Sequence, residues 1–136
     1  MRSFKGAIRP LDVLIVDDSQ VLGLRLAEML RQVVGLNIVG LSKGVTEARD
    51  SIRELQPDLV ILDLQLGDGS GIDILRETKQ RDSSITFIVF TNQSEPQYRR
   101  RCIELGADYF FCKSTETKSL IATSRILIAS AGQRND

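Results

Sequence analysis

The sequence predicts an α/β domain in which five parallel strands alternate with five helices. Short apolar runs rich in β-branched residues recur along the chain, and each is followed by a longer segment of helical periodicity. The third run, LVIL, is apolar at every position, which is typical of a strand that helices cover on both faces. The expected strands are residues 13–16, 37–41, 59–62, 86–90 and 109–112.

Capping and breaking residues predict where the helices begin and end. Ser19 is placed to cap the first helix, and Pro57 ends the second, expected over 46–56. A third helix is expected over 72–79. The segment Ser94-Glu95-Pro96-Gln97 resembles a capping box before a fourth helix that closes at Gly106, and the last helix is expected over 115–131. The expected inward-facing residues are Leu22, Leu26, Met29, Leu30 and Val33 in the first helix, Ala48, Ile52 and Leu55 in the second, and Leu120, Ile121, Leu127 and Ile128 in the last.

Length and composition limit the organisation of the chain and its classes of function. The 136 residues, 42% of them hydrophobic, are enough for one domain, expected over 11–132 between loose ends at 1–10 and 133–136. Lys plus Arg and Asp plus Glu both number 18, so no net charge favours direct binding of nucleic acid. No apolar stretch approaches the roughly 20 residues that would cross a bilayer, and the N-terminus is a poor secretory signal. We therefore expect a cytoplasmic protein without membrane insertion.

Two residue types exclude further chemistry. The two cysteines, Cys102 and Cys112, have the spacing of neither a disulfide framework nor a zinc site, so both are expected to be reduced packing residues. The chain contains no histidine. No mechanism can therefore use an imidazole of this chain as base, metal ligand or phosphocarrier.

Polar side chains follow four of the expected strands. Asp17 and Asp18 end the first strand, Asp63 the third, Thr91 the fourth and Lys113 the fifth. In an open parallel sheet these strand ends meet at one edge, where ligands bind. Clustered carboxylates repel one another unless a cation lies among them, and ligands that are all oxygen suit Mg²⁺. An ammonium and a hydroxyl beside that ion would receive a tetrahedral oxyanion, and a central carboxylate could accept a phosphoryl group.

An ordered set of motifs resembles the receiver domain of two-component response regulators. These motifs are VDDS at 16–19, VILDL at 60–64, GDGSG at 67–71, FTN at 90–92 and GADYFFCKS at 106–114. The resemblance extends from about residue 11 to residue 131. It implies a flavodoxin-like, doubly wound five-stranded sheet of strand order 2-1-3-4-5.

The resemblance also implies roles for the residues at the strand ends. Asp63 would be the phosphoacceptor, and Lys113 and Thr91 would contact phosphoryl oxygens. The metal, Mg²⁺ or Mn²⁺, would be held by Asp17, Asp18, Asp63 and the backbone carbonyl of Gln65. Such a chain catalyses only its own phosphorylation and dephosphorylation, so we do not expect an enzyme acting on a separate substrate.

Other positions concern switching and hydrolysis. Phe110 lies where receivers carry an aromatic residue that turns inward once the threonine, here Thr91, moves toward the phosphoryl group. The side chains of Gln65 and Gln93 flank the expected approach of water. Ser114 replaces the proline that usually follows the lysine, which could hold Lys113 less firmly. Gly67 stands where proline is common, so we expect a more mobile loop.

The expected donor is a sensor histidine kinase or a histidine phosphotransfer protein. The fourth helix, fifth strand and last helix would form a switchable face, with Tyr98 and Arg99-Arg100-Arg101, for a downstream protein or a second receiver. The chain could be a stand-alone receiver or part of a longer regulator. One alternative is a receiver-like interaction module that never takes phosphate. A weaker alternative is an aspartyl phosphohydrolase of the haloacid dehalogenase kind, which would need an aspartate where Gln65 stands.

Overall fold

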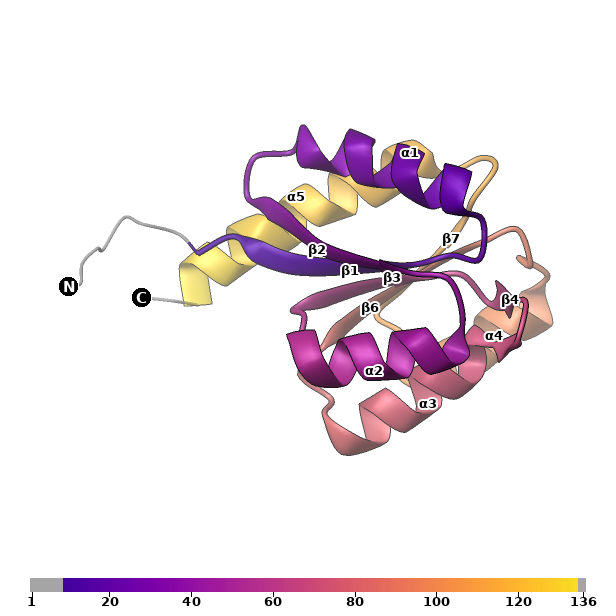
Figure 1. Ribbon diagram of the computed structural model, residues 1–136. Coiled ribbons are helices and arrows are strands. Elements are labelled where there is room, and N and C mark those ends of the chain that lie inside the picture. The colour runs from indigo at the N-terminus through magenta and orange to yellow at the C-terminus, as the bar shows by residue number, and fades with distance from the viewer. Residues whose placement is uncertain (1–8, 135–136) are drawn as a thin grey trace.

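The computed structural model describes residues 9–134, which form one sheet between two layers of helices (Figure 1). The sheet strands are β1 (Leu11–Val16), β2 (Leu36–Ser42), β3 (Leu59–Leu62), β6 (Thr86–Thr91) and β7 (Tyr109–Cys112). The helices are α1 (Gln20–Arg31), α2 (Val45–Leu55), α3 (Gly71–Arg81), α4 (Pro96–Glu104) and α5 (Thr117–Arg134). All sheet pairs are parallel in the order β2-β1-β3-β6-β7, which confirms the predicted order of the five strands.

Alternation along the strands divides the core between the two faces of the sheet. In β1, Val13 and Ile15 point to the layer of α1 and α5, whereas Leu14 and Val16 point to the layer of α2, α3 and α4. All four residues of β3 are at most 1% exposed, as predicted for a strand covered on both faces. The central strands are therefore rigidly packed, and the residues directly after them are firmly positioned.

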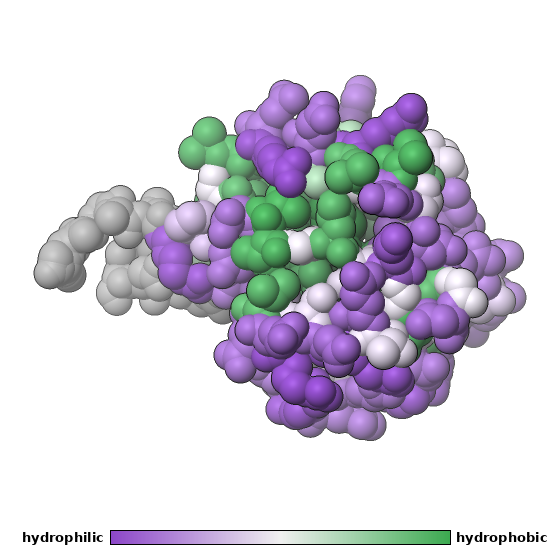
Figure 2. Space-filling model, viewed as in Figure 1, coloured by the Kyte–Doolittle hydropathy of each residue, from purple (hydrophilic) through white to green (hydrophobic). Residues whose placement is uncertain are grey.

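The predicted inner stripe of α1 is wrong at two positions. Leu22 and Met29 are 42% and 40% exposed, whereas the helix buries Gly23, Leu26, Ala27 and Leu30. The buried residues recur at the i, i+3, i+4 and i+7 spacing of one helix face, and Leu22 and Met29 each precede that face by one position. In Figure 2, hydrophobic residues accordingly gather on the surface around α1 and the edge strand β2.

Two further local predictions are also wrong. Leu55 is 42% exposed because it lies over Gly40 of β2, the edge strand, where the sheet ends. The capping box does not form, since the N-cap of α4 is Glu95 and no side chain caps it. Pro96 at the first position removes one of the N–H groups that a cap would satisfy.

The loop expected after β3 contains an antiparallel hairpin that the sequence did not predict. Its strands are β4 (Gln65–Leu66) and β5 (Gly69–Ser70), with Gln65 paired to Ser70 and Leu66 to Gly69. A Cβ at Gly71 would collide with the carbonyl oxygen of Asp63, so glycine allows α3 to begin against the end of β3.

The residues assigned to the loose ends, 1–10 and 133–136, lie mostly outside the described residues. Within residues 9–134, no helix is long and apolar enough to cross a membrane.

Candidate functional site

Four strands bring the predicted site residues to the carboxyl edge of the sheet. The Asp63 N–H donates to the Val16 carbonyl at 2.9 Å, and the Lys113 N–H donates to the Thr91 carbonyl at 3.0 Å. These bonds continue the strand ladders by one step, so the backbone of both residues is held as firmly as the strands themselves. Asp17 is fixed in the same way by its N–H bond to the Ser42 carbonyl at 2.9 Å.

Lys113 joins the two buried carboxylates of the site. Its Nζ donates to Asp17 Oδ2 at 2.6 Å and to Asp63 Oδ2 at 2.7 Å. Burial lowers the pKa of Lys113, but the bonds to Asp17 and Asp63 outweigh it, and the net pKa is raised above its ordinary value. Every peptide bond among residues 9–134 is trans, so the Lys113–Ser114 bond is trans as well, and Lys113 nevertheless reaches both carboxylates.

The second oxygen of Asp63 is also held. Thr91 Oγ1 donates to Asp63 Oδ1 at 2.7 Å and itself accepts the Gln93 N–H at 3.1 Å. The Gln65 N–H lies 3.3 Å from the same Asp63 oxygen. The structure thus brings Asp63, Lys113 and Thr91 into direct contact, and it places Gln65 and Gln93 beside them through their backbones.

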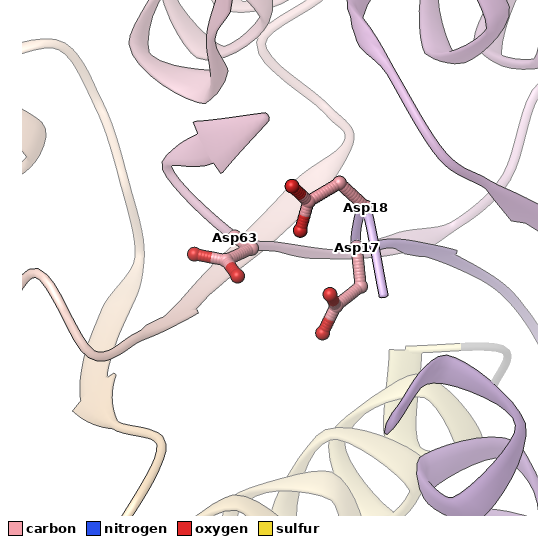
Figure 3. A group of neighbouring side chains, drawn as sticks. All are labelled: Asp17, Asp18 and Asp63. Atoms are coloured by element: carbon pink, nitrogen blue, oxygen red, sulfur yellow. The ribbon is translucent and has the colours of Figure 1, made fainter. Parts of the chain in front are cut away.

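Three carboxylates meet at this edge (Figure 3). One oxygen each of Asp17, Asp18 and Asp63 lie within 4.8 Å of one another, with Asp17 and Asp63 buried and Asp18 exposed. Among residues 9–134, only the Lys113 ammonium forms an ion pair with these carboxylates, so the cluster has room for a cation to balance the remaining charge. The donor set is all oxygen and opens to solvent on the Asp18 side, which fits a divalent ion such as Mg²⁺ that keeps several of its waters.

Phe110, the predicted switch residue, is turned into the core and is 3% exposed. Arg99 of α4 contacts Phe110 in two ways: its Nη1 donates to the Phe110 carbonyl at 3.2 Å, and its Cζ lies 5.7 Å from the centroid of the Phe110 ring. This distance is within the range of a cation–π contact. The sequence identified Arg99 only as part of a basic run and gave no signal of this contact.

The two cysteines differ in their surroundings. Cys102 is fully buried in the core, as expected of a packing residue, and burial raises its pKa to about 11. Cys112 is partly exposed, and hydroxyl groups of Ser114, Thr115 and Ser94 lower its pKa to about 6. The sequence missed this difference because the hydroxyls come from two separate loops.

A second missed residue is Asp68. Its carboxylate accepts the Val45 N–H at the start of α2, at 2.7 Å. The partner lies 23 residues away in the sequence, so no local pattern reveals it.

Several known proteins are similar to this sequence over most of its length. The chain is 35% identical over 127 residues to the DNA-binding response regulator MtrA of Mycolicibacterium paratuberculosis, covering 91% of this chain and 52% of that protein. It is 26% identical over 116 residues to the response regulator protein VraR of Staphylococcus saprophyticus, covering 85% and 56%. It is 33% identical over 110 residues to a protein-glutamate methylesterase/protein-glutamine glutaminase of Methanospirillum hungatei, covering 79% and 32%. The chain therefore spans between about a third and just over half of these relatives.

Solved structures share the fold. A signal receiver domain of a putative Luxo repressor protein from Vibrio parahaemolyticus superimposes with a TM-score of 0.82 at 25% identity, covering 93% of this chain and 95% of that one. The response regulator domain of Thermotoga maritima CheB superimposes with a TM-score of 0.78 at 23% identity, covering 92% of this chain and 98% of that one. The family model of the response regulator receiver domain matches residues 13–125. This chain belongs to the response regulator receiver family.

Proposed function

We propose that the chain is a phosphoacceptor receiver that takes a phosphoryl group from a partner's phosphohistidine onto Asp63. The observation that carries this proposal is the Asp63 carboxylate, held on one oxygen by Lys113 and on the other by Thr91, beside the carboxylates of Asp17 and Asp18. A purely structural carboxylate would not need two further carboxylates near it, because their repulsion costs stability.

In the proposed reaction an Asp63 oxygen attacks phosphorus in line with the leaving nitrogen. The O–P bond forms as the P–N bond breaks, and the electron pair stays on the donor's imidazole. Lys113 and the Thr91 hydroxyl bind oxygens of the transferred group and neutralise its charge. Asp17, Asp18, Asp63 and the Gln65 carbonyl would hold Mg²⁺, and the bound ion would neutralise further charge on the transferred group. Because these 136 residues contain no histidine, the phosphohistidine lies outside them, on a sensor histidine kinase or a histidine phosphotransfer protein, or a small phosphodonor takes its place.

The proposed output is a shift between two arrangements of Thr91, Phe110 and the face formed by α4, β7 and α5. The contact of Thr91 with Asp63 and the position of Phe110 on β7 support this proposal. A nearly complete switch requires the phosphoryl group to favour one arrangement by about 5 kcal/mol. The face would then bind a downstream protein or a second receiver.

The first test is the intact mass of the protein after incubation with phosphoramidate and Mg²⁺. We expect a gain of one phosphoryl group in the parent and none in Asp63→Asn. No gain in the parent, with Mg²⁺ binding demonstrated by calorimetry, would favour the interaction module that never takes phosphate. Repeated turnover of a phosphate ester would favour the phosphohydrolase, which the amide at Gln65 argues against.

We also propose slow to moderate hydrolysis of the aspartyl phosphate. The amides of Gln65 and Gln93 can orient a water molecule but cannot take its proton strongly. The decay of the phosphorylated mass over time measures this rate, and a half-life of seconds would contradict it.

A further inference from the structure

Helix α2 has no cap of its own. Its N-cap residue is Gly44, which has no side chain to accept the first N–H groups of the helix. Asp68 supplies the missing acceptor: Oδ1 lies 2.7 Å from the Val45 nitrogen, and Oδ2 lies 3.4 Å from the Thr46 nitrogen. The cap of α2 therefore comes from the segment that follows Asp63.

Two glycines create the space for this contact. A Cβ on Gly44 would lie 2.8 to 3.0 Å from the carboxylate atoms of Asp68, so any larger residue would push the carboxylate away. A Cβ on Gly69 would lie 3.0 Å from the Val45 side chain, and Gly69 has a positive φ of 155°. At the tip of the hairpin, Asp68 and Gly69 are thus fitted closely against the start of α2.

The base of the same hairpin lies at the candidate phosphoryl site. Gln65 pairs with Ser70 across the hairpin, and its N–H approaches Asp63 Oδ1 at 3.3 Å. Only Leu66 of the hairpin strands is buried, and two-residue strands are marginally stable by themselves. Anchoring the tip on α2 therefore adds a constraint on the base, which is otherwise held by the buried Leu64 and Leu66 and by the Gly71 N–H bond to the Leu64 carbonyl.

We propose that Asp68 is a positioning residue for the phosphoryl site, fixing the hairpin on α2 so that the Gln65 backbone keeps its place beside Asp63. This inference rests on the proposed function, because the Gln65 carbonyl is an expected metal ligand there. Groups that orient ligands from outside the metal shell typically change metal affinity by 10- to 100-fold when they are replaced. Because Asp68 is exposed, we expect the lower end of that range.

The test compares Asp68→Ala with Glu47→Ala. Glu47 is a matched control because it is a carboxylate at the same end of α2 whose Oε1 accepts the Lys43 N–H at 2.7 Å. Calorimetry with Mg²⁺ alone should show about tenfold weaker binding for Asp68→Ala and parent-like binding for Glu47→Ala. Asp68→Asn keeps an acceptor oxygen and should recover most of the affinity. Equal Mg²⁺ affinity in Asp68→Ala and the parent would overturn the proposal.

A second measurement needs no metal. Amide hydrogen exchange at Gln65 and Leu66 should accelerate in Asp68→Ala and not in Glu47→Ala. Gly44→Ala should reproduce the effect of Asp68→Ala, and adding it to Asp68→Ala should cause no further change, because both remove the same contact. Additive effects of Gly44→Ala and Asp68→Ala would overturn the positioning role. Exchange that rises equally in Asp68→Ala and Glu47→Ala would overturn it as well.

The outcomes separate this inference from the proposed function. If the parent binds Mg²⁺ with an Asp68-dependent affinity yet takes no phosphoryl group, the positioning role stands and the phosphoacceptor role fails. If the parent is phosphorylated and Asp68→Ala leaves Mg²⁺ affinity and exchange unchanged, the phosphoacceptor role stands and the positioning role fails.

Discussion

Both edges of the sheet set a basic side chain against aspartates, but the amino edge does so in water and the carboxyl edge largely in the protein interior. At the amino edge, Asp58 accepts hydrogen bonds from Arg9 Nη1 and Nη2, at 3.1 and 2.9 Å, and from the Asp12 N–H at 2.8 Å. The Arg9 side chain is 64% exposed, so water still solvates its charge. At the carboxyl edge, one lysine faces Asp17 and Asp63, whose side chains are only 5% and 10% exposed, with Asp18 close by.

The difference lies in burial. At the amino edge Arg9 faces the carboxylates of Asp12 and Asp58 in contact with solvent, and Asp58 also accepts a backbone N–H, so the arrangement stabilises the fold. The carboxyl edge gathers three carboxylates around one lysine, and two of the three are buried, which costs stability until a cation balances the charge. Such a cost is typical of functional sites.

The largest expected effect is that of Lys113→Met. Removing one partner of a buried ion pair costs about 3 kcal/mol, because the other charges remain buried without compensation. We expect that loss in the free energy of unfolding by urea with EDTA present, and a smaller loss with Mg²⁺. Arg9→Met is the matched control and should lose less than about 1 kcal/mol, as for other exposed pairs. Equal losses at the two edges would remove the contrast between them.

A smaller effect is expected from Asp58→Asn, with a defined dependence on pH. Burial raises the pKa of Asp58, but the bonds from Arg9 and the Asp12 N–H outweigh it and hold the net pKa below the usual value. A lowered folded pKa stabilises the protein above the unfolded pKa of about 3.9, and this contribution is lost as pH falls through the folded value.

Asp58→Asn should therefore cost about 1 kcal/mol at pH 7, since charge-assisted bonds are stronger than neutral ones. The difference in unfolding free energy between parent and variant should shrink as the pH falls below about 4. A difference that grows toward low pH would contradict this account of the amino edge.

The smallest expected effect has the opposite sign. Asp63→Asn removes one of three clustered carboxylates and keeps one acceptor oxygen, which can serve Thr91 or Lys113 but not both. Without metal, we expect the free energy of unfolding to rise by about 0.5 kcal/mol, because the repulsion at the carboxyl edge falls. Urea unfolding with EDTA measures it beside Asp58→Asn. A destabilised Asp63→Asn would show that this carboxylate supports the fold.

The outcome at particular residues shows how far sequence reasoning extends. LVIL at 59–62 was recognised as a doubly covered strand because its apolar pattern is local, and Asp63 follows directly. The parallel order then placed Asp17, Asp63, Thr91 and Lys113 at one edge, and their contacts agree with that placement. Leu22 and Met29 were misplaced because hydrophobicity alone does not distinguish adjacent helix faces.

By itself, the sequence determined the alternation of strands and helices, the strand order implied by the resemblance, and the kinds of chemical group at the carboxyl edge. These features follow from the hydrophobic periodicity and from the residues directly after each strand. Both signals are local, because each spans only a few neighbouring positions in the sequence. Only the tertiary structure decided that Asp68 caps α2, that Arg99 covers Phe110, and that a hairpin forms after Asp63. Each joins segments whose partners become known only when the chain has folded, because a hydrogen-bonding group has no preference for one distant partner until packing brings them together.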